Sequence, residues 1–177
     1  MGRTMILHDT RLEGRTPLNY NFVYLVNANR SISSIISGVA GHARSCGVER
    51  GGFGLQLGRE GLSLGNVSQT TRWKGLIKTI VVFACATADT APGNEGTRAD
   101  GQRLCGELAL WSGADVIAAR DTQFYNERTA SYSRGRSVEN TIDFGAWEGP
   151  VYRFSRDSGY PSTITPGAYN MASPRTM

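Results

Sequence analysis

The chain has 177 residues, enough for one domain with a substantial hydrophobic core, so the fold needs no disulfide or metal ion to hold it together. Hydrophobic residues make up 40% of it and charged residues 19%, as in ordinary globular proteins, and no run is apolar enough to cross a membrane. The net charge of +4 comes from arginines scattered along the chain, so we expect charge that aids solubility rather than a nucleic-acid-binding surface.

The cysteines exclude several kinds of site. Cys46, Cys85 and Cys105 are odd in number and unrelated in spacing, which indicates neither a disulfide framework nor a CxxC metal site and fits a reducing compartment. No charged segment followed by an apolar one opens the chain, so we expect a cytoplasmic protein without a secretory signal. No phosphate-binding loop or dinucleotide fingerprint is present, so we expect no cofactor.

The N-terminal part predicts two strands and a helix. Met5–Leu7 predicts a short edge strand, and Phe22–Val26 has the composition of a strand. Ser31 is a suitable cap for a helix over residues 31–37, because four apolar residues follow it at helical spacing. These residues are Ile32, Ile35, Ile36 and Val39.

The segment after this helix can be interpreted in two ways. With a helix break near Gly38 or Gly41, Val39–Ala43 is a short strand that ends at His42. Without the break, the helix continues to Ser45.

Alternating apolar residues then predict a β-hairpin over Gly52–Leu64, with its turn at Gly58–Gly61. A short helix begins at Asn66 or Ser68 and runs through Trp73.

The segment Thr79–Asp89 is the one around which we expect the fold to be organised. Its short apolar run is typical of a strand buried on both faces. Ligands in open α/β sheets bind at the carboxyl ends of strands, and Cys85 lies at such an end among small residues. We interpret Cys85 as a nucleophile or the descendant of one. The alternative is a buried cysteine with a packing role only.

The C-terminal half predicts one more helix and several strands. Asp100 caps a helix that Gly113 ends, with Leu104, Leu108 and Trp111 on one face. Predicted strands follow at Val116–Ala119, Thr141–Phe144 and Val151–Phe154. We expect one domain over residues 1–155 and a polar, proline-containing tail over residues 156–177.

Alternating strands and helices imply an α/β protein with a mostly parallel sheet. The hairpin at Gly52–Leu64, the strand that leads to Ala84-Cys85 and the segment Ser112–Ala118 together resemble the caspase-like fold. They are most similar to the bacterial branch near the gingipain, CHAT and separase-type cysteine peptidases. The resemblance covers about Phe22–Phe154. It implies a three-layer sandwich with a mostly parallel central sheet and an added β-hairpin.

The resemblance also implies a cysteine endopeptidase that cleaves peptide bonds through a thioester. Cys85 would be the nucleophile and His42 the acid/base that favours the thiolate and protonates the leaving amine. The family usually has glycine after this histidine, whereas Ala43 follows it here. If His42 lies on a helix out of reach, the chain is an inactive protein-binding module on the same fold. His8 is the other histidine and the weaker candidate.

An acidic residue beside the cysteine would select substrates with Arg or Lys. Asp121 and Asp89 are the candidates, with ordinary loop or cap carboxylates as the alternative. The expected partner is a protein or peptide substrate, with no nucleic acid and no membrane. A nucleic-acid-binding domain would instead use Arg134, Arg136 and the arginines of the tail.

Overall fold

The computed structural model describes residues 3–12, 21–53, 56–82, 87–90, 92–97, 100–121, 131–133, 136–138, 147 and 149–165. Its elements are, in chain order, β1 (Arg3–Asp9), β2 (Phe22–Val26), α1 (Ile32–Cys46), β3 (Val48–Phe53), the 3-10 helix η1 (Val67–Trp73), β4 (Thr79–Val82), α2 (Gly101–Ser112), β5 (Asp115–Ala119), β6 (Ser131–Ser133), β7 (Arg136–Val138), β8 (Val151–Phe154) and β9 (Pro161–Ile164).

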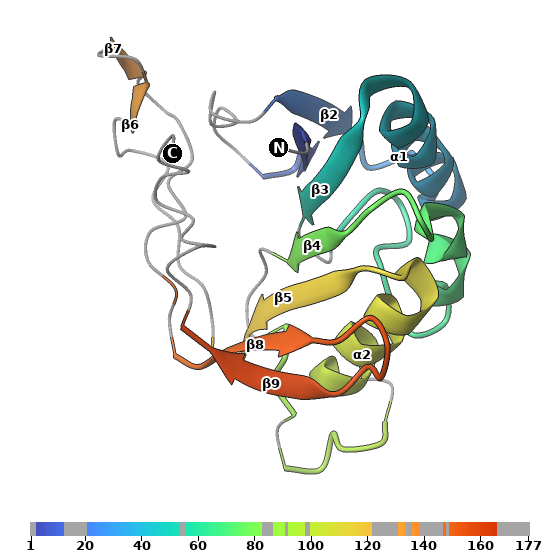
Figure 1. The fold of residues 1–177 in the computed structure, drawn as a ribbon, viewed down its shortest axis with the longest axis vertical. Helices are drawn as coiled ribbons and strands as arrows, with labels where there is room; N and C mark the ends of the chain where they lie inside the picture. The colour runs from blue at the N-terminus through green and yellow to red at the C-terminus, as the bar shows by residue number, and fades with distance from the viewer. Residues whose placement is uncertain are drawn as a thin grey trace.

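Seven strands form one sheet in the order β2-β1-β3-β4-β5-β8-β9 (Figure 1). The first five are parallel to one another, whereas β8 and β9 pair antiparallel. Every residue of β5 is buried, as expected for a strand covered on both faces. β6 and β7 pair only with each other. The α/β class and the mostly parallel sheet predicted from the sequence are confirmed.

Both long helices begin and end where the chain supplies caps. The Ser31 side chain accepts a hydrogen bond from the backbone N–H of Ser34 at the start of α1, and Asp100 caps α2 in the same way. Gly47 follows α1 and Gly113 follows α2, both with a φ of 66° that glycine adopts without strain. The predicted caps and the predicted end of α2 are confirmed.

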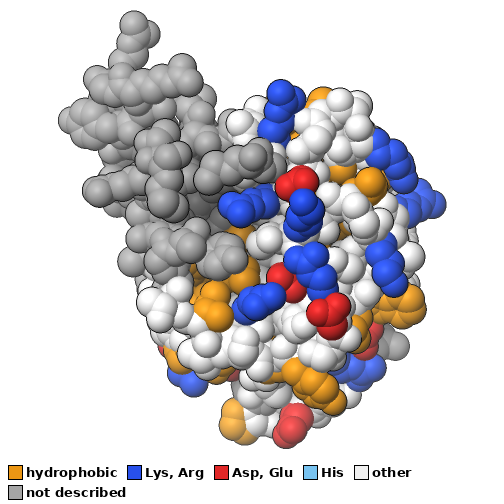
Figure 2. All heavy atoms as spheres, viewed as in Figure 1, with side chains coloured by type: hydrophobic (Ala, Val, Ile, Leu, Met, Phe, Trp, Pro, Cys, Tyr) orange, Lys and Arg blue, Asp and Glu red, His pale blue; other side chains and the backbone are white. Residues whose placement is uncertain are grey.

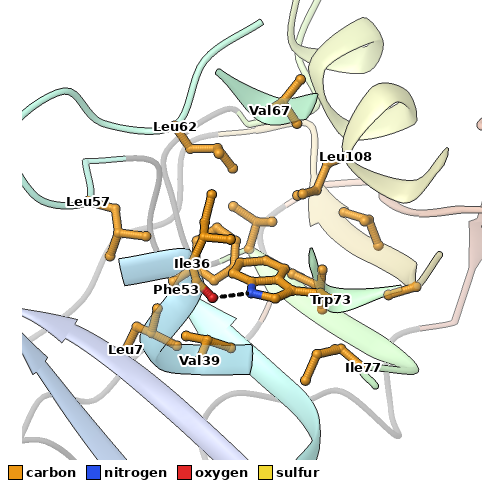
Figure 3. Close-up of a cluster of buried hydrophobic side chains, with 14 of the residues drawn as sticks. Leu7, Ile36, Val39, Phe53, Leu57, Leu62, Val67, Trp73, Ile77 and Leu108 are labelled. Atoms are coloured by element: carbon orange, nitrogen blue, oxygen red, sulfur yellow. Dashed lines mark hydrogen bonds between the residues drawn. The ribbon is translucent and has the colours of Figure 1, made fainter. Parts of the chain in front are cut away.

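The helical elements lie over one face of the sheet, to its right in Figure 1. Trp73 lies at the centre of the core beneath them, with 2% of its surface exposed (Figure 3). Its indole Nε1 donates a hydrogen bond of 3.0 Å to the Ile36 carbonyl oxygen. This bond ties η1 to α1 while the ring packs among apolar side chains that include Val39 and Phe53.

Helix α1 ends at Cys46, in agreement with the interpretation in which the helix continues to Ser45. The predicted break near Gly38 or Gly41 is wrong, because the buried stripe of the helix continues through Val39 and Ala43. Burial of that stripe outweighs the cost of about 1 kcal/mol that glycine imposes on a helix interior. His42 therefore belongs to a helix and not to the end of a strand.

The predicted β-hairpin over Gly52–Leu64 is also wrong. β3 ends at Phe53, and the described chain beyond residue 56 forms turns instead of a strand pair. Leu57 and Leu62, which the alternation assigned to strands, are buried anchors of this loop at 1% and 5% exposed. A period of two over so few residues does not distinguish a strand from a loop with buried anchors.

Two predicted boundaries need correction at the ends of the chain. The strand predicted at Met5–Leu7 lies inside the sheet between β2 and β3, not at its edge. Pro161–Ile164 forms β9 within the predicted tail, because proline is tolerated as the first residue of an edge strand and Gly159 allows the turn before it.

The strand at Val151–Phe154 is confirmed, whereas that at Thr141–Phe144 lies outside the described residues. No helix in the described part of the chain is long and apolar enough to span a bilayer.

The core has one small defect that a substitution can fill. A void of about 10 Å³ lies between β3 and the helical layer, lined by apolar side chains and Gly51. A Cβ added at Gly51 would lie 3.8 Å from its nearest neighbour, the Met5 carbonyl oxygen. We expect Gly51→Ala to raise the free energy of unfolding by about 0.5–1 kcal/mol in urea titrations, because the methyl group fills the void and the unfolded chain loses entropy.

Gly58→Ala is the matched control. Gly58 has a φ of 67°, and an added Cβ would strike the Arg30 carbonyl oxygen. This variant should lose about 1–3 kcal/mol. A loss of stability in both variants would mean that the void does not accept a methyl group.

Candidate functional site

The sheet topology selects one edge of the sheet for a ligand site. The parallel strands β1, β3, β4 and β5 all end at the same side, which we call the carboxyl edge, and begin at the opposite side, the amino edge. In Figure 1 the arrowheads of β3, β4 and β5 point toward the carboxyl edge. The strand order reverses between β1 and β3, and ligands in such sheets bind at the carboxyl ends near this point.

Asp9 is the most strongly engaged side chain at the carboxyl edge. It ends β1, is 8% exposed, and accepts hydrogen bonds from Arg11 Nε at 2.8 Å, Arg11 Nη2 at 2.7 Å and Gly58 N at 2.8 Å. Burial alone would raise the pKa of Asp9, but the hydrogen bonds from Arg11 and Gly58 outweigh it and hold the pKa below its ordinary value. Asp9 therefore anchors the loop after β3 to the end of β1.

His8 also lies at the carboxyl edge, one residue before Asp9. It is 7% exposed, and its Nε2 lies 2.8 Å from the Leu12 carbonyl oxygen. Because a carbonyl only accepts, this nitrogen carries the proton and donates it. That bond fixes the tautomer and the orientation of the ring.

His42 lies elsewhere in the fold. It is exposed on α1, where its ring meets the Tyr24 ring edge-on at a centroid distance of 5.6 Å. α1 ends at Cys46 and leads through Gly47 into the first residue of β3, so His42 is one helical turn from the amino edge. His42 therefore lies in the helical layer and not at the carboxyl end of a strand.

The predicted nucleophile, Cys85, lies outside the described residues, three positions after Val82 at the end of β4. The described residues after it are deeply buried, with Thr87 2% and Ala88 0% exposed. The backbone N–H of Ala88 donates a 3.0 Å hydrogen bond to the carbonyl oxygen of Ala119, the last residue of β5. The chain beyond Cys85 therefore continues along the carboxyl edge.

The other two cysteines differ sharply in accessibility. Cys46 is half-buried at the end of α1, whereas Cys105 is buried in α2 with its Sγ 3.7 Å from the Thr87 carbonyl oxygen. Burial raises the pKa of the Cys105 thiol far above its ordinary value. Cys105 is therefore a packing residue and a natural internal control for thiol reactivity.

The two predicted specificity residues lie near one cation of the chain itself. Arg120 Nε donates to Asp121 Oδ1 at 2.8 Å, and about half of each side chain is exposed. The pKa of Arg120 is raised, chiefly by its hydrogen bond to Asp121 and to a smaller extent by the charge of Asp89. Asp121 is therefore paired with an arginine of this chain.

Sequence reasoning missed Asp9 and Arg11. A signal was available, because Asp9 directly follows the apolar run at Met5–Leu7 and so ends a buried strand. The interpretation of that run as an edge strand gave no reason to expect Asp9 to be buried. Among the described residues, no three His, Cys, Asp or Glu side chains gather as a metal site requires.

A scan against protein-family models, a search of curated proteins and a search of solved structures each found no match.

The Asp9 anchor predicts a pH-dependent loss of stability. We expect Asp9→Asn to lower the free energy of unfolding by about 1–3 kcal/mol at pH 7, because a charge-assisted hydrogen-bond network is lost. The pKa of Asp9 is lowered in the fold, so its contribution is complete above its unfolded pKa of about 3.9 and fades as pH falls through the folded value.

Urea titrations at neutral pH and at about pH 3, below the unfolded pKa, check this expectation. The difference between the parent protein and Asp9→Asn should shrink at the lower pH. Asp157→Asn, at an exposed aspartate, is the control and should change little at either pH. A difference that does not vary with pH would argue against a charged anchor.

Proposed function

We propose that this chain is a catalytically inactive caspase-like module that binds protein partners. The observation that carries the proposal is the position of His42 near the amino edge. Cys85 comes after the carboxyl end of β4, and a strand of four to six residues spans about 13–20 Å. An imidazole that activates a thiol needs hydrogen-bond reach, about 3 Å, or one bridging water. We propose that the fold is a three-layer sandwich. The described residues form the sheet and one helical layer of it.

The edge strand β2 supports a binding role. Val23 and Leu25 lie in β2 with 42% and 61% of their surfaces exposed, and Phe22–Val26 contains no charge and no proline. Edge strands usually carry such residues to prevent pairing with another chain. β9 at the other edge begins with Pro161 and exposes serine and threonine. The contrast favours β2 as the place where an extended apolar segment of a partner protein adds a strand.

A displayed library of extended peptides tests the binding role of β2. We expect apolar sequences to be enriched and Leu25→Lys to weaken their binding at least about tenfold, because it puts a charge where a partner side chain packs. Leu110→Lys is the control, since Leu110 is an exposed apolar residue of α2 at 44% exposure. Equal binding by both variants would exclude β2 as the docking strand.

Thiol reactivity tests the absence of catalysis. In iodoacetamide labelling between about pH 5 and pH 9, followed by mass spectrometry, we expect Cys85 to show the same pH profile as a cysteine in a short unstructured peptide. Cys105 should remain unlabelled until the protein unfolds, because it is buried. His42→Ala should leave the Cys85 profile unchanged. Cys85 labelling that persists at low pH and is lost in His42→Ala would overturn the proposal.

One observation favours a second candidate function, a cysteine endopeptidase. His8, unlike His42, lies at the carboxyl edge, with only β3 between its strand and β4. A dyad of Cys85 and His8 would make Cys85 labelling persist at low pH, and His8→Ala but not His42→Ala would abolish it. Cleavage of a peptide library that Cys85→Ala eliminates would decide for this function over the binding module.

A further inference from the structure

Basic residues that are far apart in the sequence meet at the amino edge of the sheet. β1, β3 and β4 begin there, and α1 and β8 end there, so the basic residues at these termini come together. We call this the amino-edge basic surface; its members are Arg3, Arg44, Arg50, Lys74, Lys78, Arg153 and Arg156. Among the described residues, the acidic ones at this edge are Glu49, Asp115 and Asp157.

Asp115 holds two of these arginines in fixed positions. Arg153 Nη2 donates to it at 2.8 Å and Arg156 Nη2 at 3.1 Å, and Arg156 also donates to the Lys78 carbonyl oxygen at 2.7 Å. Burial alone would raise the pKa of Asp115, but the hydrogen bonds from Arg156 and Arg153 lower it to about 2. One carboxylate thus orients two guanidinium groups and leaves a net positive charge.

Other members of the surface have no such compensation. Lys78 pairs with Glu49 at 2.7 Å, but none of the ion pairs among the described residues involves Arg44, Arg50 or Lys74, which are all exposed. In Figure 2 lysine and arginine side chains are scattered over the face in view, with acidic and apolar ones between them. The unpaired cations are available to an anionic ligand.

Exposed aromatic rings lie at the same end of the molecule. Tyr160 is 77% exposed in the turn between β8 and β9, and Trp111 is 44% exposed in the last turn of α2, just before β5 begins. The turn is held by a 2.7 Å hydrogen bond from Gly159 N to the Ser155 carbonyl oxygen and packs against Leu110 of α2. Both rings are therefore carried by described structure at the amino edge.

We propose that the amino-edge basic surface binds single-stranded nucleic acid. Arg44, Arg50 and Lys74 contact phosphates, and Tyr160 and Trp111 stack on unpaired bases, the combination by which proteins hold single strands without sequence preference. From β1 to β8 the surface extends over about 19 Å at about 4.8 Å per strand, enough for several nucleotides.

Two features favour a single strand over other anions. The faces of bases are open to stacking only where they are unpaired, which disfavours a duplex. Entry into a bilayer would require a whole apolar face, whereas among the described residues the large apolar side chains exposed at this edge are Leu110, Trp111 and Tyr160 alone. Single-strand binding differs from the sequence-based expectation of charge that only aids solubility, and it is independent of the peptide binding proposed for β2.

Fluorescence anisotropy with a labelled mixed-sequence DNA single strand of about 15 nucleotides tests the proposal. We expect the logarithm of the binding constant to fall linearly with the logarithm of salt concentration, by about 0.7 per phosphate contact. Arg44→Gln combined with Arg50→Gln should weaken binding and reduce that slope by about 1.4. Arg59→Gln combined with Arg103→Gln removes the same charge elsewhere and should have a much smaller effect.

Tyr160→Ala tests the stacking contribution separately. It should weaken binding about tenfold without changing the salt slope, while Tyr160→Phe should bind like the parent protein. A flat salt response, equal weakening by both arginine pairs, duplex DNA bound as tightly as the single strand, or preference for phosphatidylserine vesicles would each overturn the proposal. Circular dichroism establishes that the variants are folded.

Discussion

The continuous hydrogen-bond ladder from β3 through β4 to β5 is the constraint on which the other features depend. At the beginning of this ladder, the backbone N–H of Lys78 donates to the Glu49 carbonyl oxygen at 2.7 Å. The Lys78 carbonyl oxygen accepts from the backbone N–H of Asp115 at 3.0 Å, so the three strands start in register. Because the strands are parallel, every connection must cross from one edge of the sheet to the other over its face. The ladder thereby assigns each loop residue to one edge, and this decides which side chains can meet.

Local chemistry made much of the fold predictable. Phe22–Val26 and the core of β5 are strands by composition, and Ser31, Asp100 and Gly113 mark helix boundaries through hydrogen bonds within a few residues. Features that depend on distant partners were not predictable. Whether an apolar run lies inside a sheet or at its edge depends on which strands pair with it, and whether alternating leucines form a hairpin depends on what they pack against.

In the candidate site, too, local features were predictable and features that depend on distant contacts were not. The sequence identified Asp89 and Asp121 as acidic residues after two strands, and the fold brings both near Arg120. It did not determine whether His42 lies on a strand or a helix, since the choice depends on burial of Val39 and Ala43 against the sheet. That tertiary contact places His42 on a helix and not at a strand end, whereas His8 lies at the end of β1. The anchor formed by Asp9 and Arg11 was hidden for a related reason, because it exists only when the loop after β3 returns to the end of β1.

A carboxylate–arginine anchor stands at each edge of the sheet, and the two have different consequences. Asp9 at the carboxyl edge accepts from Arg11 and a backbone amide, so its charge is largely matched and its role is to close a loop. Asp115 at the amino edge is paired with two arginines, so one positive charge remains in excess. Asp115 fixes the positions of the two guanidinium groups that carry it. Because both carboxylates have lowered pKa values, both anchors keep their charge at neutral pH and weaken only in acid. Among the described residues, the anchor at the carboxyl edge therefore matches its own charge, and the amino edge, where Arg44, Arg50 and Lys74 form no ion pair, is better suited to a charged ligand.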